Sequence, residues 1–307
     1  MSAINNAGAA SPQDAAEVRA GVIAALFVYG FWGVLPLIFN LLHEVSAFTV
    51  VADRTVWSLL LVGGVLLATG RMGDVRRALR DPQTLRSMLI SAALLACNWL
   101  IYVYSIVSGQ VLEASFGYFI NPICNVAIAM LLLGERQNRM QTLAIALAVL
   151  GIAIAAIGVG GVPYIALGLA LTFAFYGYFR KTAKVDSATG LFVETLVLVP
   201  VALGYLAFTF MTQGPGPHAD PFLLTILILT GPATALPLLA FAFAVKRLRF
   251  TTIGMFQYIA PSIVFVLGIT FFGEHLTPVR LVSFVIIWIS LAIYTADSFR
   301  QRHRKAA

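Results

Sequence analysis

Long apolar runs, separated by short polar segments, follow one another along almost the whole chain. Each run holds roughly 20 residues, the length at which a helix crosses a hydrocarbon layer of about 30 Å. A helix satisfies its own backbone hydrogen bonds in lipid, and these runs lack the alternation of membrane β-strands. The pattern predicts an all-α polytopic membrane protein with ten transmembrane helices, near Val22–Leu42, Phe48–Thr69, Ser87–Val107, Val111–Leu133, Met140–Ile157, Val162–Phe179, Gly190–Met211, Phe222–Val245, Thr251–Phe272 and Pro278–Thr295.

A short pattern occurs twice in the chain. Pro122, followed by Gly134 and Glu135, recurs 139 residues later from Pro261 to Glu274. The two copies lie five apolar runs apart, so the second must be inverted in the membrane relative to the first. Inverted repeats of this kind build transporters. The match is sparse, and a coincidence on an apolar background is the alternative.

The repeat divides the chain into four parts. Residues 1–16 are small and polar, which predicts a disordered cytosolic tail. Residues 17–157 and 158–297 are the two expected inverted five-helix repeats. Residues 298–307 form a basic cytosolic tail.

Composition and charge are consistent with this topology. Apolar residues make up 60% of the chain and charged residues 11%. If the N-terminus is cytosolic, every Lys and Arg except Arg54 and Arg280 falls in a cytosolic loop or tail. The positive-inside rule therefore predicts ten spans with both termini in the cytoplasm. Topology and contact with anionic membrane lipid explain the net charge of +7 more simply than nucleic-acid binding.

Catalytic and cofactor motifs are missing from the sequence. No Gly-Lys pair occurs, which excludes a Walker A loop, and there is no His-Glu-x-x-His or Gly-x-Ser-x-Gly motif. The four histidines are scattered over predicted loops and the tail, so they do not form a metal site on one helix face. We expect no enzymatic activity, no metal and no cofactor.

Polar residues inside the expected spans must find a partner in the bundle or line a wet cavity. On the fourth span, Glu113, Tyr118, Asn121 and Asn125 fall within one broad helical stripe. The third span carries Asn98, Tyr102 and Ser105 at similar spacing, and the first carries Tyr29 and Trp32. These stripes predict a central cavity. The alternative is that the polar residues only hold helices together.

The repeated prolines favour the cavity. A proline inside a helix frees the carbonyl four residues earlier, here those of Tyr118 and Gln257. Proline-interrupted spans at matching positions in two repeats are a sequence indicator of a transporter binding site. Helix kinks at Pro122 and Pro261 that serve packing alone are the alternative.

Charged residues inside the spans each have two interpretations. Glu113 lies in the first turn of its span, where it either stabilises the helix end or couples transport to protons. Glu194 lies about one turn into the seventh span, as a proton or ligand group or as a carboxylate neutralised by Arg180 or Lys181. Adjacent residues of a helix do not face each other, so Asp53 and Arg54 are expected to pair with other helices or reach the interface.

A family resemblance is carried by Leu112 to Pro122, Asn98-Trp99, Phe173 to Gly177, Arg180-Lys181, Glu194 to Leu196 and Phe256 to Pro261. Together these motifs resemble the RarD group of EamA-type transporters in the drug/metabolite transporter superfamily. The resemblance implies ten helices in two inverted repeats in the bacterial inner membrane. It does not define a substrate, since the group carries a chloramphenicol-sensitivity label while other relatives export amino acids and metabolites.

The sequence thus predicts a secondary transporter, an exporter of a small organic metabolite or drug. Glu113 and Glu194 are the coupling candidates. The alternative is a membrane scaffold or sensor without transport, and a monomer and a homodimer are both open. The expected substrate cavity is lined by Trp32, Asn98, Trp99, Tyr102, Tyr118, Asn121, Tyr176, Gln257 and Tyr258.

Overall fold

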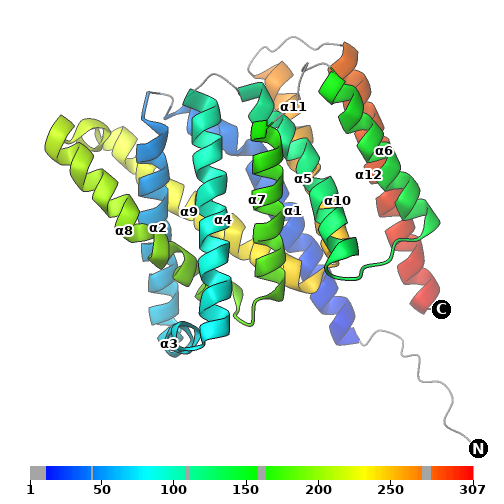
Figure 1. Ribbon diagram of the computed structural model, residues 1–307, viewed down its shortest axis with the longest axis horizontal. Coiled ribbons are helices and arrows are strands. Elements are labelled where there is room, and N and C mark those ends of the chain that lie inside the picture. Colours follow the sequence, from blue (N-terminus) through cyan, green and yellow to red (C-terminus); the bar gives the residue numbers. More distant parts are fainter. Residues whose placement is uncertain (1–11, 43, 108–110, 158–163, 272–277, 307) are drawn as a thin grey trace, which may run out of the picture.

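The computed structural model describes residues 12–42, 44–107, 111–157, 164–271 and 278–306 (Figure 1). In this part of the chain the backbone is helical throughout apart from short connections, and no strand occurs. The all-α prediction is therefore confirmed. The elements are α1 (Pro12–Asn40), α2 (Ala47–Ala68), α3 (Met72–Arg80), α4 (Pro82–Val107), α5 (Val111–Leu131), α6 (Arg139–Ile157), α7 (Tyr164–Thr182), α8 (Ser187–Gln213), η1 (Gly216–Ala219), α9 (Pro221–Arg247), α10 (Phe250–Phe256), α11 (Ile259–Thr270) and α12 (Pro278–Ala306).

Each of the ten expected spans overlaps a helix, with differences at three places. Helix α1 begins at Pro12, so residues 12–16 are helical, whereas residues 1–11 lie outside the described part. Helix α12 continues to Ala306 through the expected basic tail. The ninth span is broken into α10 and α11 at Gln257 and Tyr258.

Helix α3 is an addition that the apolar runs did not predict. It is short and amphipathic, with Val75 and Ala78 buried and Arg76, Arg77 and Arg80 exposed. It packs against α8 and leads directly into α4. The segment is too polar to be recognised as a membrane span. Its apolar residues Val75 and Ala78, at i and i+3, nevertheless pack against the bundle.

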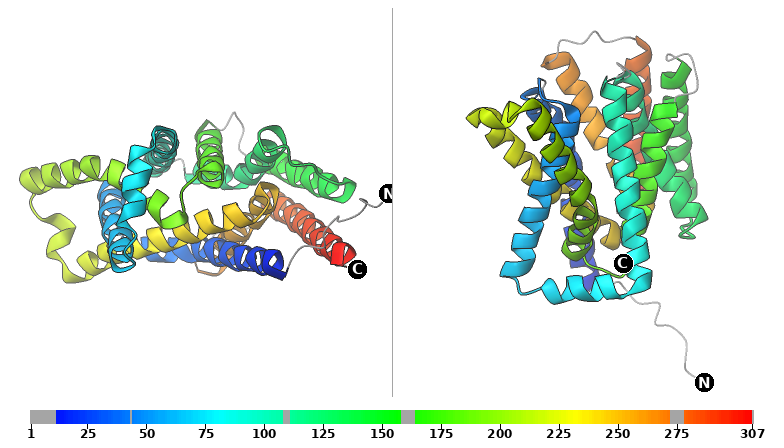
Figure 2. Two further views of the ribbon diagram at one scale, coloured as in Figure 1. Left: turned by 90° about the horizontal axis from the view of Figure 1, so that it is seen from below. Right: turned by 60° about the vertical axis from the view of Figure 1, so that its left-hand side comes forward.

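The helices form an elongated bundle in which the two parts of the chain interdigitate. Viewed from below, the helices lie in two rows (Figure 2). The most extensive contacts join α5 to α7, α6 to α12, α2 to α8 and α9, α1 to α9, and α4 to α7. Every one of these contacts joins a helix before residue 158 to a helix after residue 163. Neither part therefore has its own separate core.

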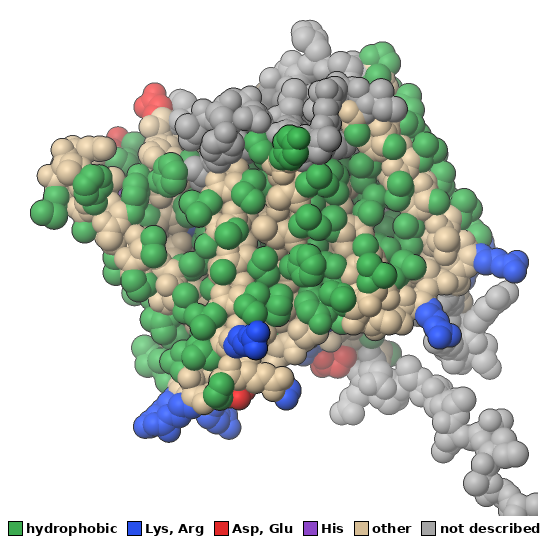
Figure 3. Space-filling view, in the orientation of Figure 1, with side chains coloured by type: hydrophobic (Ala, Val, Ile, Leu, Met, Phe, Trp, Pro, Cys, Tyr) green, Lys and Arg blue, Asp and Glu red, His purple; other side chains and the backbone are tan. Residues whose placement is uncertain are grey.

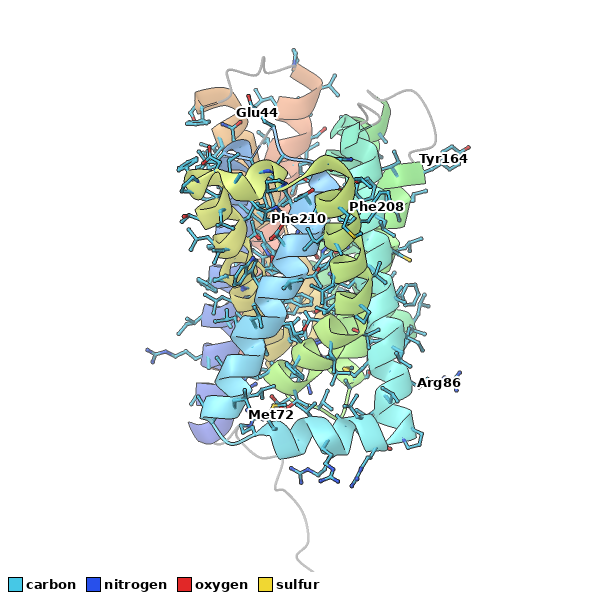
Figure 4. The ribbon with its side chains drawn as sticks, turned by 90° about the vertical axis from the view of Figure 1, so that its left-hand side faces the viewer. Glu44, Met72, Arg86, Tyr164, Phe208 and Phe210 are labelled. Carbon is cyan, nitrogen blue, oxygen red and sulfur yellow. The ribbon has the colours of Figure 1, made fainter. Side chains whose placement is uncertain are left out.

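The surface shows how the bundle meets lipid. Apolar side chains cover the visible face, and Lys and Arg gather along its lower edge (Figure 3). In the described residues, five helices are long and apolar enough to cross a membrane, and three shorter apolar helices accompany them. The edge view places Met72 and Arg86 at one end and Glu44 at the other (Figure 4). We call the end with Met72 and Arg86 the basic end.

Candidate functional site

Five helices from both parts of the chain converge on Arg54. Arg54 is the eighth residue of α2, about 10 Å along the helix from the end opposite the basic end. Its Nε donates to Thr234 Oγ1 of α9 at 2.9 Å. Its Cζ lies 4.6 Å from the ring centroid of Trp99 and 5.9 Å from that of Phe39. Both distances are within the range of cation–π attraction.

Two tyrosines complete this group, which we call the Arg54 cluster. Tyr102 and Tyr118 have ring centroids 6.4 Å apart in an edge-to-face arrangement, and both phenols lie within electrostatic range of Arg54. Tyr118 is 47% exposed although it contacts α4 from α5. The Tyr118 ring is therefore only partly covered. The cluster brings together three predicted cavity residues, Trp99, Tyr102 and Tyr118, around a cation that the cavity prediction left out.

Asp53 has a different environment from its neighbour Arg54. Its Oδ1 accepts from Trp57 Nε1 at 3.3 Å, and its Oδ2 lies 2.9 Å from His218 Nε2. His218 belongs to η1, so this contact ties α2 to the connection between α8 and α9. Adjacent residues of one helix point to different neighbours, as expected.

Asn121 and Asn125, which follow Tyr118 on α5, form a buried network of side-chain amides with Gln257. Asn125 Nδ2 donates to Gln257 Oε1 at 2.6 Å and to Asn121 Oδ1 at 3.3 Å. Asn121 Nδ2 donates to the Ala170 carbonyl at 2.8 Å. All three amide side chains are buried. The network joins α5 to α7 and to the break after α10, so it connects the two parts of the chain.

Asn98 has the role of a helix connector in this conformation. Its Nδ2 donates to the Leu169 carbonyl at 3.0 Å and to Thr172 Oγ1 at 2.9 Å, which joins α4 to α7. This matches the alternative in which polar residues hold helices together.

The repeated prolines occupy unlike positions. Pro122 lies inside the continuous helix α5, whereas Pro261 lies in the first turn of α11, just after the break. Gly254 of α10 packs against this region, and a Cβ built there would lie 2.9 Å from the Pro122 carbonyl oxygen. The close approach of α10 to α5 therefore requires a glycine. Gly273 and Glu274 of the second copy lie outside the described residues.

Three of the expected cavity residues pack within the helical core. Trp32 lies 5.6 Å from Phe173 between ring centroids, in a cluster that also contains Tyr176. Tyr176 and Tyr258 are fully buried. In this conformation neither tyrosine lines an open space, because the neighbouring helices cover both rings.

Glu194 is paired rather than free. Arg180 Nη1 lies 3.5 Å from Glu194 Oε1, with both side chains 0% exposed, and Ser91 donates to the same oxygen. Glu194 Oε2 is buried and has no hydrogen-bond partner among the described residues. Lys181 donates instead to the carbonyls of Val245 and Leu248 at the end of α9. Arg180 is thus the neutralising group of the two expected.

Glu135, from the first copy of the repeated pattern, caps a helix of the other half. Gly134 lies in the turn after α5 with φ 64°, a left-handed conformation that favours glycine, and Glu135 follows it directly. Glu135 Oε1 then accepts from the Phe250 amide at 2.6 Å, and Oε2 accepts from the Thr251 amide at 3.2 Å and its hydroxyl at 2.7 Å. We call this contact the Glu135 cap.

Sequence reasoning missed two of these residues and leaves one undetermined. Arg54 carried a signal, because it is one of two basic residues that break the positive-inside pattern. Glu135 was noted only as part of a repeat, since a cap from a distant loop leaves no local pattern. The Glu113 side chain lies outside the described residues. No group of three or more potential metal ligands occurs in the part that the structure describes.

Apolar helices that pack through buried polar contacts define a multi-pass membrane protein, and comparison with known proteins defines its family. Residues 19–157 and 162–296 each match the EamA-like transporter family. The chain belongs to this family and is a membrane transporter of the RarD group. Protein RarD of Salmonella typhimurium is 40% identical over 295 residues, covering 95% of this chain and 100% of that protein. Protein RarD of Escherichia coli (strain K12) is 38% identical over 292 residues, covering 95% and 99%.

A solved structure has the same fold. A crystal structure of a protein 17% identical in sequence matches with a TM-score of 0.70, over 90% of this chain and 97% of that one. At this identity the likeness supports the fold alone.

Proposed function

We propose that this transporter moves a small organic solute outward across the bacterial inner membrane by alternating access. It does so with ten spans in two inverted five-helix repeats, with the basic end and both termini in the cytoplasm. The Arg54 cluster is the solute site, and the amide network is the joint about which the halves move.

The observation that carries the proposal is the symmetry of helix contacts. In span order, α1, α2, α4, α5 and α6 of the first repeat correspond to α7, α8, α9, α10–α11 and α12 of the second. When the two sets are exchanged, the α1–α9 contact becomes α7–α4, and the α2–α9 contact becomes α8–α4. The α5–α7 contact corresponds to α11–α1, while α2–α8, α6–α12 and α5–α10 correspond to themselves. A pseudo-two-fold relation of this kind supports two states of similar energy in which access alternates.

The position of the cluster supports a transport role. Arg54, Trp99, Tyr102 and Tyr118 come from the first repeat and Thr234 from the second, so a rocking motion between repeats changes their separation. Solute sites of secondary transporters lie at such repeat interfaces. Glu194 acts as a coupling group in this scheme only if it exchanges its partner Arg180 during the cycle.

Flux into proteoliposomes tests the proposal directly. Purified protein is reconstituted and assayed with a panel of amino acids and amphenicols, with protein-free liposomes as the control. Solute-dependent flux above the control supports transport. A complete absence of flux, with correctly inserted protein, would favour the scaffold or sensor alternative.

Thiol labelling tests the topology. In a background without Cys97 and Cys124, Gly214→Cys should react with an impermeant reagent in intact cells, and Arg77→Cys should react only in opened cells. Gly214 follows α8 at the end opposite α3, which carries Arg77. Reaction of both from one side would contradict the inverted repeat.

A further inference from the structure

Arg54 places a positive charge inside the bundle, within the spanning helix α2. Arginine in a spanning segment is costly, and such residues face cavities, pair with acidic groups or mark solute pathways. Among the described residues, no carboxylate lies within ion-pair distance of Arg54. Its neighbour Asp53 is already engaged by Trp57 and His218.

The hydrogen-bond donors of Arg54 are only partly used. Nε donates to Thr234, whereas Nη1 and Nη2 have no hydrogen-bond partner in the described part of the chain. Arg54 is half-buried as a residue, and its Cζ lies over the Trp99 ring. Thr234 and Trp99 therefore fix the orientation of the group and leave two adjacent donors available.

Two donors of a fixed guanidinium match one chemical class of ligand. A planar fork of this kind binds the two oxygens of a carboxylate, or two oxygens of a phosphate, in a bidentate arrangement. The rings of Trp99, Tyr102 and half-exposed Tyr118 offer apolar surface beside the fork. An aromatic wall with one oriented charge is typical of a small-molecule site.

We propose that Arg54 binds the oxyanion of the transported solute, and that the solute is a small organic anion with an aromatic or other apolar body. This inference rests on the proposed function, because it names the solute class of the same site. Thr234 acts as a positioning residue through Nε, and the aromatic rings bind the apolar body.

Binding of two matched probes tests the inference. The full-length protein, in nanodiscs of phosphatidylcholine, is titrated with indole-3-acetate and with indole-3-acetamide, which differ in charge. We expect wild type to bind the acetate at least tenfold more tightly, a difference of about 1.4 kcal/mol. Arg54→Gln should bind both probes equally, and Arg54→Lys should retain only part of the preference. The exposed Arg76→Gln on α3 is the matched control and should behave as wild type.

Three results of these titrations would overturn the inference. They are equal binding of both probes by wild type, an unchanged preference in Arg54→Gln, and no binding of indole-3-acetate, benzoate or phenyl phosphate by wild type. Folding of each variant is checked by gel filtration and thermal unfolding. Arg54→Lys retains the charge, so the test survives if Arg54→Gln does not fold.

Two further experiments follow. The first distinguishes a lipid headgroup from a solute as the source of the oxyanion, and the second distinguishes a failure of this inference from a failure of the proposed function. If phosphatidylglycerol added to the nanodiscs abolishes the acetate preference, a lipid headgroup occupies Arg54 and the solute assignment is overturned. Flux of both probes is then measured in proteoliposomes. Transport of the amide without preference for the acetate would contradict the inference while supporting transport. Acetate binding without flux of any solute would contradict the proposed function alone.

Discussion

Gly190→Ala should destabilise the protein, although alanine is the better helix former. Gly190 lies in α8 opposite the Arg180 guanidinium, and a Cβ built there would overlap Nη1 and lie 2.9 Å from Cζ. On a protein surface the flexible end of an arginine would move away at little cost. Arg180 has no such freedom, because its side chain is 0% exposed and held by Glu194 and by the Ser187 carbonyl at 3.0 Å.

The expected magnitude follows from the contact that must break. Separating a buried ion pair costs about 3–5 kcal/mol, because each charge is left without compensation. Alanine in place of glycine returns about 1 kcal/mol of helix propensity. The net loss in the free energy of unfolding is therefore about 2–4 kcal/mol.

Detergent unfolding of matched variants measures this loss. Gly204→Ala lies in the same helix with no atom within 4 Å of its Cβ, so it should be neutral or slightly stabilising. In a Glu194→Gln background the cost of Gly190→Ala should shrink, because the ion pair is already absent. Stability of Gly190→Ala equal to that of Gly204→Ala would refute the reasoning.

Substitutions at three other positions test other contacts. Gln257→Ala removes the acceptor of Asn125, so flux should fall while the protein still inserts; wild-type flux would argue against the amide network as a joint. Glu135→Ala should speed hydrogen exchange at the Phe250 and Thr251 amides, with loss of about 0.5–2 kcal/mol of helix capping; unchanged exchange would contradict the Glu135 cap. Asp186→Ala removes the cap of α8 and should cost about 1 kcal/mol at neutral pH, whereas Asp186→Asn should cost little; equal stability of both would contradict a capping role.

The pKa of Asp186 also predicts the direction in which the stability of the protein changes with pH. Burial opposes its ionisation, yet hydrogen bonds from Thr189 and the charge of Arg71 hold the pKa of Asp186 below its ordinary value. Because the pKa is lower in the folded protein than in the unfolded chain, the ionised carboxylate contributes stability at pH values above the unfolded pKa. This contribution is lost as the pH falls through the folded pKa. Wild type should lose this stabilisation under acid, and Asp186→Asn, which does not titrate there, should not.

The sequence predicts the helices well and the contacts poorly. Spanning runs are long and uniform, so composition alone locates them, and every expected run overlaps a helix. The break at Gln257 and Tyr258 was not predicted, because Pro261 permits either a kink or a new helix start. Helix α3 was missed because its stripe of Val75 and Ala78 is too short to give a clear period.

The candidate site was predicted in part, for a physical reason. A polar residue in a span signals that it needs a partner, but not which one. Asn121 and Gln257 were therefore singled out as polar positions that need partners, but their amide network was not predicted. The buried state of Tyr176 and Tyr258 depends on helices far away in sequence. Arg54 was expected to pair with another helix or to reach the interface, and it pairs with Thr234 of α9. Its aromatic neighbours were not predicted, because a helical stripe gives depth but not the neighbours around it.

The interdigitated packing of the two halves has a consequence for biogenesis. The largest helix contacts all join the first half of the chain to the second. Helices inserted early therefore wait in the lipid with their partner faces uncovered until synthesis of the later ones is complete. Assembly must then be a late, concerted step after insertion, with long-range contacts that slow folding. A chain truncated between the halves would leave Asn125 without its partner Gln257 and present this polar side chain to lipid.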